Sequence, residues 1–488
     1  MTEQAHTAHT TRELRRILMP LALAQFICSF AGSNMNVMIN DISKDLNTTV
    51  KGVQVAITLF LLVMAALMIP GGKLTDLYGR TRLFRLGLVI YAVGAILSAA
   101  SPGLGVLILG NSILEGVGTA LLIPPVYILT TLFFTQTTTR ARAFGAISGM
   151  GGIGAAAGPL IGGVITTTIS WRASFVFQAL VIVFIVILSR RIEDPIPADP
   201  SRPFDIRGSV LSAVGLVLFV MGIMAIETSG WLALGLMLAG ALVLFGFYLS
   251  IRSEERHGKE PLLSTAVLKI RTANLGLVTQ CAQWLLLLGM SFTVATFLQV
   301  VRGYDAIQTG VIFTATTAGL LISSLLQERF ARRREQRTVI IAGFIITTVG
   351  VAALLVLASG SPSPWALAPG LFVIGLGLGV MLTPSVNIVQ SSVGDALQGE
   401  MSGLSRCISN LGSSLGTAIA GTILVLDLNR NGYAAAMITL TGIGLIGLGA
   451  AWLLPRGMKP KVIDLSDASA PIGAAAADKS TGVAQAPG

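Results

Sequence analysis

Residues 52–82 read GVQVAITLFLLVMAALMIPGGKLTDLYGRTR. The run 52–72 contains no Asp, Glu, Lys or Arg, and about 20 apolar residues are enough to cross a bilayer as one helix. A short segment rich in glycine and charge follows at once, at 72–82. An uncharged run of this length with a brief charged connection behind it predicts a membrane-spanning helix that ends at a polar surface.

The same alternation recurs along the whole chain. Only 11% of the 488 residues are charged and the mean hydropathy is +0.79, whereas soluble domains carry about 25% charged residues. Because backbone groups in hydrocarbon must be paired within the segment, each span should be an α-helix. The long interval 338–394 allows two crossings divided at 361–364, so the sequence predicts 14 transmembrane helices. The uncharged intervals are 17–40, 52–72, 86–114, 116–139, 143–171, 173–189, 208–226, 228–251, 272–301, 306–327, 338–394, 407–426 and 431–455.

These helices are expected in the order six, two, six. A cytoplasmic tail at 1–16 precedes six helices at 17–190, and a linker with two further helices occupies 191–271. Six more helices follow at 272–455, and the tail at 456–488 has the Ala-, Ser- and Gly-rich composition of a disordered segment. The expected fold is an all-α polytopic membrane protein with two six-helix bundles and two extra helices between them.

The two sets of six show signs of duplication. An acidic residue followed three positions later by a small and then a basic residue occurs after the second helix of each set, at 76–80 and 328–332. Parallel repeats of this kind are typical of transporters that bind their substrate between the halves. Glycine pairs four apart occur in the fifth helix of each set, at Gly154 and Gly158 and at Gly412 and Gly416.

Basic residues predict the orientation. With a cytoplasmic N-terminus, the cytoplasmic segments hold 27 of the 33 Lys and Arg residues and the outer connections hold five. By the positive-inside rule, both termini are expected in the cytoplasm and the chain in the cell (inner) membrane. The net charge of +10 then reflects topology and contact with membrane lipids, and it does not indicate nucleic-acid binding.

The charged connection after the second helix has a further possible role. Gly72 and Gly79 allow helix ends to approach closely, and Asp76 and Arg80 place charge at the cytoplasmic surface, with Arg140 as a plausible partner. We interpret these residues as a gating latch where the two bundles meet. An ordinary polar loop is the alternative.

The fifth helix carries a run of small residues that favours close helix packing. Small residues four apart permit tight contact in lipid, and proline introduces a bend. Packing alone is the alternative to a role in transport, and the two are compatible. The residues are Gly154, Gly158, Pro159, Gly162 and Gly163.

Together these segments resemble a known family. The 72–82 connection, the glycines of the fifth helix, Trp171-Arg172 and Gly403-x-x-Arg406 are similar to motifs of the major facilitator superfamily, in its 14-helix drug:proton antiporter branch. The resemblance covers about 17–455. It implies alternating-access export of small, often lipophilic or cationic molecules, driven by inward proton flow.

The chain departs from that branch where ions would be coupled. Ala31 stands where the branch usually has an acid in its first helix, and Ser112 and Glu115 stand where the fourth helix usually has arginine and glutamine. Glu115 is roughly 16 Å along its helix from Leu104 at about 1.5 Å per residue, where an ionised carboxylate is costly. Three readings stay open: a proton carrier, a permanently protonated structural acid, or a direct contact to a cationic substrate. Arg406 is the intramembrane basic candidate to pair with it.

The expected walls of a central cavity are the first, fourth, ninth and tenth helices. Polar and polarisable side chains on the first and ninth helices, with Arg406 on the thirteenth, are the candidates for lining it. Methionine and aromatic groups suit varied apolar ligands, and a buried amide needs a partner. Packing in the core or against lipid is the alternative for each. The candidates are Gln25, Asn34, Met35, Asn36, Met38, Gln280, Gln283, Trp284, Met290, Phe292 and Arg406.

Other classes of function fit less well. The G-x-G-x-x-G patterns at 149–154 and 442–447 lie in apolar helices without the strand that dinucleotide binding requires, so no cofactor is expected. No nucleophile–base pair or metal cluster occurs at a suitable depth, so we expect neither an enzyme nor a metal site. A dedicated exporter of one metabolite or lipid remains an alternative, as does a ligand sensor that has lost transport. We expect the protein to act as a monomer with protons as the coupling ion.

Overall fold

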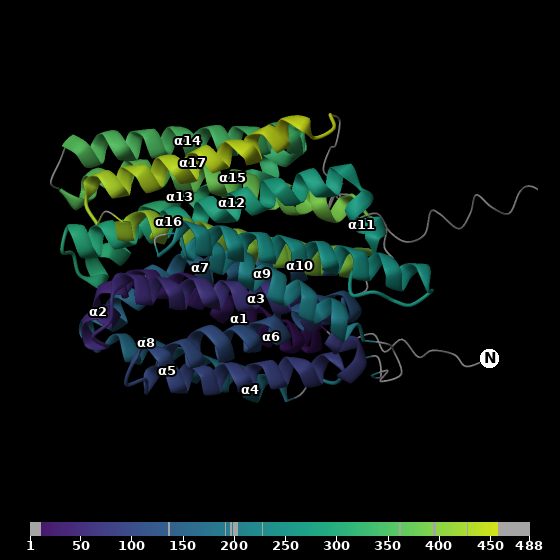
Figure 1. The fold of residues 1–488 in the computed structure, drawn as a ribbon. Coiled ribbons are helices and arrows are strands. Elements are labelled where there is room, and N and C mark those ends of the chain that lie inside the picture. Colours follow the sequence, from purple (N-terminus) through teal and green to yellow (C-terminus); the bar gives the residue numbers. More distant parts are fainter. Residues whose placement is uncertain are drawn as a thin grey trace, which may run out of the picture.

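In the computed structural model, helices joined by short connections make up most of the described residues (Figure 1). Thirteen of these helices are long and apolar enough to cross a bilayer, and the bent helix α7 would be the fourteenth. The predicted helical membrane fold is therefore confirmed. The structure describes residues 11–134, 137–190, 192–195, 198, 204–226, 228–360, 363–393, 397–426 and 428–456.

The first bundle contains six spans. The first is α1, which passes through the short helix η1 into α2, and the fourth is built of α5, the π-helix η2 and α6 in direct succession. Gly79, whose φ of 95° favours glycine, separates α3 from α4. The elements are α1 (Thr11–Asn34), η1 (Met35–Val37), α2 (Ile39–Asp45), α3 (Val50–Tyr78), α4 (Arg80–Ala99), α5 (Leu104–Leu107), η2 (Ile108–Glu115), α6 (Gly116–Phe133), α7 (Thr137–Thr168) and α8 (Trp171–Ser189).

An inserted helix pair and the second bundle follow the first bundle. The insert comprises α9 (Ile206–Met224), α10 (Gly230–Arg256) and the short α11 (Thr265–Lys269). The second bundle comprises α12 (Arg271–Thr296), η3 (Phe297–Val301), α13 (Ala306–Arg333), α14 (Gln336–Gly360), η4 (Pro364–Leu367), α15 (Ala368–Ser391), α16 (Gln398–Leu426) and α17 (Arg430–Leu453).

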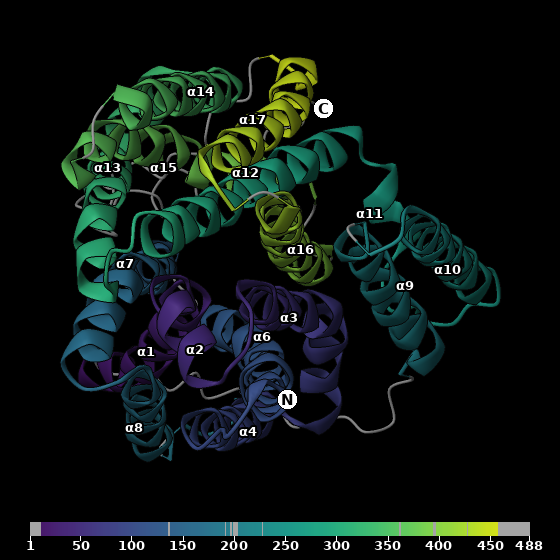
Figure 2. The ribbon, with the colours of Figure 1, turned by 60° about the vertical axis from the view of Figure 1, so that its left-hand side comes forward.

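The helices run roughly parallel to one axis, so the molecule has two end faces. We call the end where α1 begins and α11 lies the terminal face, and the end where α2 lies the far face (Figure 1). Viewed toward the ends of the helices, the two bundles lie side by side. α9 lies outside them next to α3 and α16, with α10 on its outer side (Figure 2).

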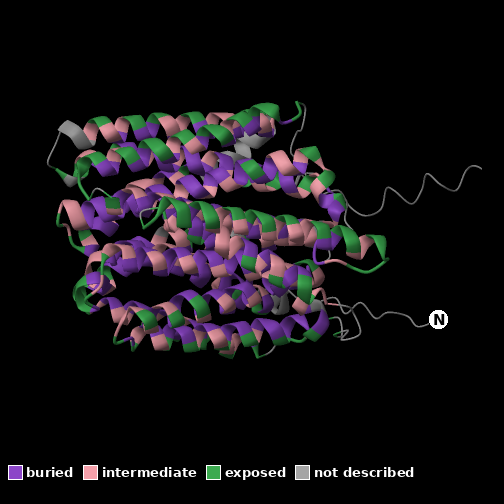
Figure 3. Cartoon of the chain, viewed as in Figure 1, coloured by how far each residue is buried: buried purple, intermediate pink, exposed green. Residues whose placement is uncertain are grey.

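The insert is attached mainly through α9. Val220 and Ile223 of α9 pack against Leu62 of α3 and Ala418 of α16, so α9 contacts both bundles at once. α10 packs on α9 and exposes much of its length (Figure 3), including Trp231, which is 85% exposed. Its exposed apolar side chains suit contact with lipid tails.

Candidate functional site between the two bundles

Two helix pairs make the most extensive contacts between the bundles. In the first pair, α7 of the first bundle meets α13 of the second, and in the other pair α3 meets α16 (Figure 2). At the α7–α13 seam, a Cβ atom on Gly163 would come within 2.5 Å of the Ala306 carbonyl oxygen. Only glycine therefore allows this close approach. At the α3–α16 seam, the Ser414 hydroxyl donates to the Thr58 carbonyl at 3.1 Å.

Several hydrogen bonds hold the bundles together toward the far face. The Gln299 amide in η3 donates to the Asn36 carbonyl at 2.7 Å and accepts from the Asn40 amide at 3.2 Å. These two backbone groups flank the break between η1 and α2, so one side chain of the second bundle satisfies both. The Ile307 amide also donates to the Thr167 hydroxyl at 3.1 Å. Gln299 was not singled out from the sequence, because its partners are backbone atoms distant in the chain.

The other glycines of the fifth helix pack inside the first bundle. A side chain on Gly154 would collide with the Phe26 carbonyl, and one on Gly158 would meet Ser33 and the Phe30 carbonyl of α1. Gly162 lies equally close to Asn34. Pro159 is buried, and its carbonyl lies where a Cβ on Gly310 of α13 would be.

The second bundle repeats this contact. Side chains on Gly412 and Gly416 of α16 would collide with the carbonyls of Cys281 and Leu285 on α12. The carbonyl pairs are four residues apart in both bundles, as are the glycine pairs. The helices that the sequence related by duplication therefore make the same contact.

A polar cluster lies where α1 and α6 of the first bundle face α16 of the second. The Tyr127 hydroxyl donates to Gln25 Oε1 at 3.1 Å and accepts a hydrogen bond from Arg406 Nη2. The Arg406 guanidinium also lies 4.5 Å from the centre of the Tyr127 ring, and Phe144 of α7 stacks on that ring at 6.0 Å. An amide, a cation and two aromatic rings from both bundles thus meet at one place. Tyr127 was missed from the sequence, although it is the one tyrosine of α6 and follows two prolines.

The candidate residues at the end of α1 are buried near the far face. Asn34 donates to the Ser174 hydroxyl of α8 at 2.8 Å, while its Oδ1 atom has no partner. Met35 and Asn36 lie in η1, and Met38 contacts the Thr166 hydroxyl through its sulfur. These side chains therefore help to pack the part of the molecule near the far face.

The candidate amides on α12 are satisfied within the second bundle. Gln280 donates to the Ser409 hydroxyl at 2.8 Å and accepts from the Ser405 hydroxyl at 2.9 Å, so it ties α12 to α16. Gln283 donates to the Leu378 carbonyl and accepts from Ser385 of α15. Two further candidates on α12, Met290 and Phe292, are buried, and Trp284 is half-buried.

Glu115 lies inside the first bundle rather than between the bundles. It ends the π-helix η2 and is fully buried, with Ser98 Oγ at 3.4 Å from Oε1 and Tyr91 within hydrogen-bonding reach. Its Oε2 atom has no hydrogen-bond partner. Tyr91 in turn donates to Gln178 of α8 at 2.6 Å. Ser98 is one residue before the end of α4, so the carboxyl group is in the half nearer the far face.

The two departures from the family pattern are both buried. The Ser112 hydroxyl donates to the Ala56 carbonyl at 2.7 Å and so joins η2 to α3. Ala31 is packed in the core of the first bundle. In the described part of the chain, Arg406 pairs with Tyr127 and no basic side chain reaches Glu115.

The latch residues cluster at the terminal face. Arg80 Nη1 lies 3.8 Å from Asp194 Oδ1, and Asp194 Oδ2 accepts from the Thr81 amide at 3.1 Å, which caps the start of α4. Arg140 donates to the Phe134 carbonyl at 2.9 Å. Asp194, which follows α8, was not picked out from the sequence.

Two latch glycines have different surroundings. Gly79 adopts a positive φ beside Asp194, whereas the nearest atom to a Cβ on Gly72 would be Pro124 Cβ, at an ordinary 3.7 Å. The side chain of Asp76, and those of the second latch at 326–333, lie outside the described residues.

Two relatives and one solved structure are similar over most of the chain. The puromycin resistance protein pur8 of Streptomyces alboniger is 27% identical over 460 residues, which is 90% of each chain. A probable actinorhodin transporter of Streptomyces coelicolor is 30% identical over 402 residues, covering 80% of this chain and 69% of that protein. A crystal structure of a peptide transporter with sulfate has a TM-score of 0.66 and 17% identity, covering 91% of this chain and 95% of the other. That last likeness shows the fold alone.

Two six-helix bundles with a polar cluster between them form an architecture that suits a membrane transporter. The model of the Major Facilitator Superfamily matches residues 21–417. The chain belongs to this superfamily, so the resemblance inferred from its motifs is confirmed.

Proposed function

We propose that this chain is a secondary exporter of small lipophilic or cationic molecules that works by alternating access between its two bundles. The observation that carries the proposal is the cluster of Gln25, Tyr127 and Arg406, because these groups come from both bundles and meet at one place. Apolar and aromatic walls with a few polar groups suit small ligands. The antibiotic-related names of the two relatives support export as the direction of transport.

The same cluster suggests how a ligand would act on the bundles. Arg406 already occupies one face of the Tyr127 ring, and cations bind aromatic faces through the ring quadrupole. A lipophilic cation would compete with Arg406 for that ring. Ligand binding would then loosen a contact between the bundles, which is what a switch between two states requires.

We further propose that the terminal face is cytoplasmic, in the inner membrane, and that the chain acts as a monomer. The distribution of basic residues supports this orientation. The contacts of Gln299 would then hold the two bundles together at the outer face. Labelling of single cysteines placed at 259 and 430 tests the orientation: position 259 should react from the cytoplasm and position 430 from outside. The reverse pattern would refute it.

Glu115 is our candidate for proton coupling. It is a buried carboxyl group without a cationic partner among the described residues, and its Oε2 atom is unpaired. Asn111, also in η2, has an unpaired Nδ2 atom, and π-helical turns often mark functional sites. Unpaired buried polar atoms call for an explanation, and exchange of a proton or a water molecule supplies one. Burial inside the first bundle makes direct contact with the substrate the weakest of the three readings.

A dedicated exporter of one compound is the alternative that an observation favours. Each of the two relatives carries the name of a single compound, puromycin or actinorhodin. A single-substrate site would discriminate among dyes and antibiotics, whereas a multidrug site would accept several.

Purified protein in liposomes tests the proposal. We expect efflux of a lipophilic cationic dye that speeds up when a pH gradient is imposed, and competition by structurally unrelated apolar compounds. Competition by one compound only would favour the dedicated exporter. No flux of any tested dye or antibiotic, with or without a gradient, would contradict export and leave the transport-dead sensor.

A further inference from the structure

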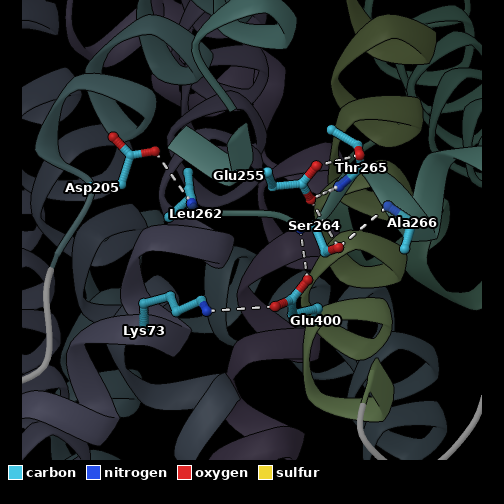
Figure 4. Close-up of polar contacts among 8 residues, drawn as sticks. All are labelled: Lys73, Asp205, Glu255, Leu262, Ser264, Thr265, Ala266 and Glu400. Carbon is cyan, nitrogen blue, oxygen red and sulfur yellow. Dashed lines mark hydrogen bonds and ion pairs between the residues drawn. The ribbon is translucent and has the colours of Figure 1, made fainter. Parts of the chain in front are cut away.

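One carboxylate at the terminal face joins three parts of the molecule. Glu400 lies in the first turn of α16, in the second bundle. Its Oε1 atom is 3.5 Å from Nζ of Lys73, which is in α3 of the first bundle, and its Oε2 atom accepts from the Ser264 amide at 2.8 Å (Figure 4). Ser264 belongs to the connection between α10 and α12, so both bundles and the insert meet at this side chain.

Carboxylates at the ends of α9 and α10 in the insert hold the same connection. Asp205, the N-cap of α9, accepts from the Leu262 amide at 3.2 Å (Figure 4). Glu255, at the end of α10, accepts from the Thr265 amide at 2.6 Å and from the Ser264 hydroxyl at 3.0 Å. Three carboxylates from three helices therefore fix the backbone of 262–265. We call this segment the strap.

The strap follows the seam that α9 covers within the membrane. α9 packs on α3 and α16 through Val220 and Ile223, and the strap reaches the same two helices at their terminal ends through Glu400. Leu263 and Val267 add apolar contacts with Met401 and Leu404 of α16. The insert is thus attached to the α3–α16 seam along its length. At the terminal face, the first bundle meets it through Ile69, which packs against the cluster of Leu263 and Val267, and through Lys73, which pairs with Glu400.

We propose that Glu400 is a positioning residue for transport, which couples the inserted helix pair to the contact between the two bundles at the terminal face. The apolar contacts and backbone hydrogen bonds keep the strap on α16. The Lys73–Glu400 pair is partly exposed, and exposed ion pairs are weak enough to form and break in each cycle. The pair therefore favours a closed α3–α16 seam while it forms, and the strap holds Glu400 in place to form it.

Two variants distinguish the ion pair of Glu400 with Lys73 from its hydrogen bond with the Ser264 amide. Glu400→Gln keeps an acceptor for the Ser264 amide but loses the charge that attracts Lys73. The exchange Lys73→Glu with Glu400→Lys restores the ion pair, but a lysine at position 400 cannot accept from Ser264. Lys73→Gln removes the pair and leaves the strap bond intact, so it serves if the Glu400 variants do not accumulate. Lys259→Gln, an exposed lysine in the same connection, controls for loss of positive charge.

Reactivity at the seam is the first readout. Ile69 lies beside Gly403 of α16, so we would introduce Ile69→Cys in a background without the native cysteines and measure thiol labelling of the full-length protein in nanodiscs. Glu400→Gln and Lys73→Gln should each speed up labelling a few-fold. The charge exchange should restore the original rate, and Lys259→Gln should leave it unchanged.

The turnover number for dye efflux is the second readout, and this arm rests on the proposed export function. The charge exchange should restore labelling but leave kcat lowered, because the strap no longer positions residue 400. Restoration of both would show that the strap is dispensable, and restoration of neither would show that the ion pair is not the contact that matters. An unchanged labelling rate in Lys73→Gln would also overturn the proposal. Labelling needs no substrate, so a failure of dye transport alone would count against the export function and not against this coupling.

Discussion

The two bundles hold equivalent glutamines in different ways. Gln25 on α1 and Gln280 on α12 each precede a carbonyl that packs against a glycine of the partner helix. Gln280 bonds to Ser405 and Ser409 within its own bundle, and it is 1% exposed. Gln25 instead reaches Tyr127, which contacts the other bundle through Arg406.

The difference has a simple cause in the sequence. Ser409 stands three residues before Gly412 on α16, and the corresponding residue on α7, three before Gly154, is Gly151. Gly151 offers no hydroxyl group and lies against the Gln25 side chain. Gln25 must therefore find partners elsewhere. At this duplicated contact, the glutamine of the second bundle holds two helices of its own bundle together. The glutamine of the first bundle instead points toward the interface between the two bundles.

The largest effect on dye efflux is expected at the glycine contact that the two bundles share. Gly158→Leu would force a side chain into Ser33 and the Phe30 carbonyl, and overpacking of this kind costs about 1–3 kcal/mol or more. We expect dye efflux per molecule to fall at least tenfold, and Gly416→Leu to act alike in the second bundle. Gly149→Leu is the matched control, because no atom lies near a Cβ at that exposed position. Normal efflux in Gly158→Leu would mean that the α1–α7 contact does not matter to transport.

A smaller effect on stability is expected at Gln280. Gln280→Ala leaves the Ser405 hydroxyl without its acceptor, and loss of such buried partners costs about 1–3 kcal/mol. Thermal unfolding in detergent should shift to lower temperature by more than it does for Gln25→Ala. An equal or larger shift for Gln25→Ala would break the distinction between the two bundles.

For transport, the larger effect is expected at Gln25. Gln25→Ala should raise the KM for a lipophilic dye several-fold, because Gln25 is the acceptor that orients the Tyr127 hydroxyl. Its unfolding temperature should change little, since the bond of Gln25 to Ser29 lies within one helix and the Tyr127 hydroxyl keeps its bond from Arg406. A variant that lost stability with an unchanged KM would assign Gln25 a structural role like that of Gln280.

The smallest effect concerns the ion pair at the start of α8. Arg172 bonds to Asp45 and lowers the pKa of that carboxyl group, whereas Arg430 at the start of α17 is exposed. A lowered folded-state pKa gives stability that is present above the unfolded value of about 3.9 and is lost as the pH falls through the folded value. Asp45 is half-exposed, so the contribution should be under about 1 kcal/mol. Asp45→Asn should therefore lower the unfolding temperature slightly at pH 7 and by less as the pH falls below about 3.9, and an equal difference at pH 7 and pH 3 would exclude the ion pair as its cause.

The fold could be predicted because charge marks the ends of membrane helices. Uncharged runs long enough to span a bilayer define the helices, and the repeat of glycine pairs defines the duplication. The breaks within spans could not be predicted. The turn η1 at Met35–Val37 and the π-helices η2 and η3 contain no proline, and they depend on tertiary partners such as Gln299.

The site was harder to predict, because lipid and protein core are both apolar. Helix rotation therefore cannot be read from hydropathy alone, and the sequence did not tell whether Glu115 faces a cavity or the inside of its bundle. Gln25 and Arg406 were both among the candidates, but their common partner Tyr127 was not. The strap was missed for a related reason: its backbone amides bond to Asp205 and Glu400, which are far away in the chain.

Gradient-driven efflux by Glu115→Gln in liposomes tests the central claim most directly. Glutamine keeps the shape and hydrogen-bonding capacity of the side chain beside Tyr91 and Ser98, but it cannot exchange a proton. We predict that efflux driven by a pH gradient disappears while downhill exchange of the dye continues. Gradient-driven efflux at the original rate in this variant would contradict the claim and leave Glu115 a structural acid.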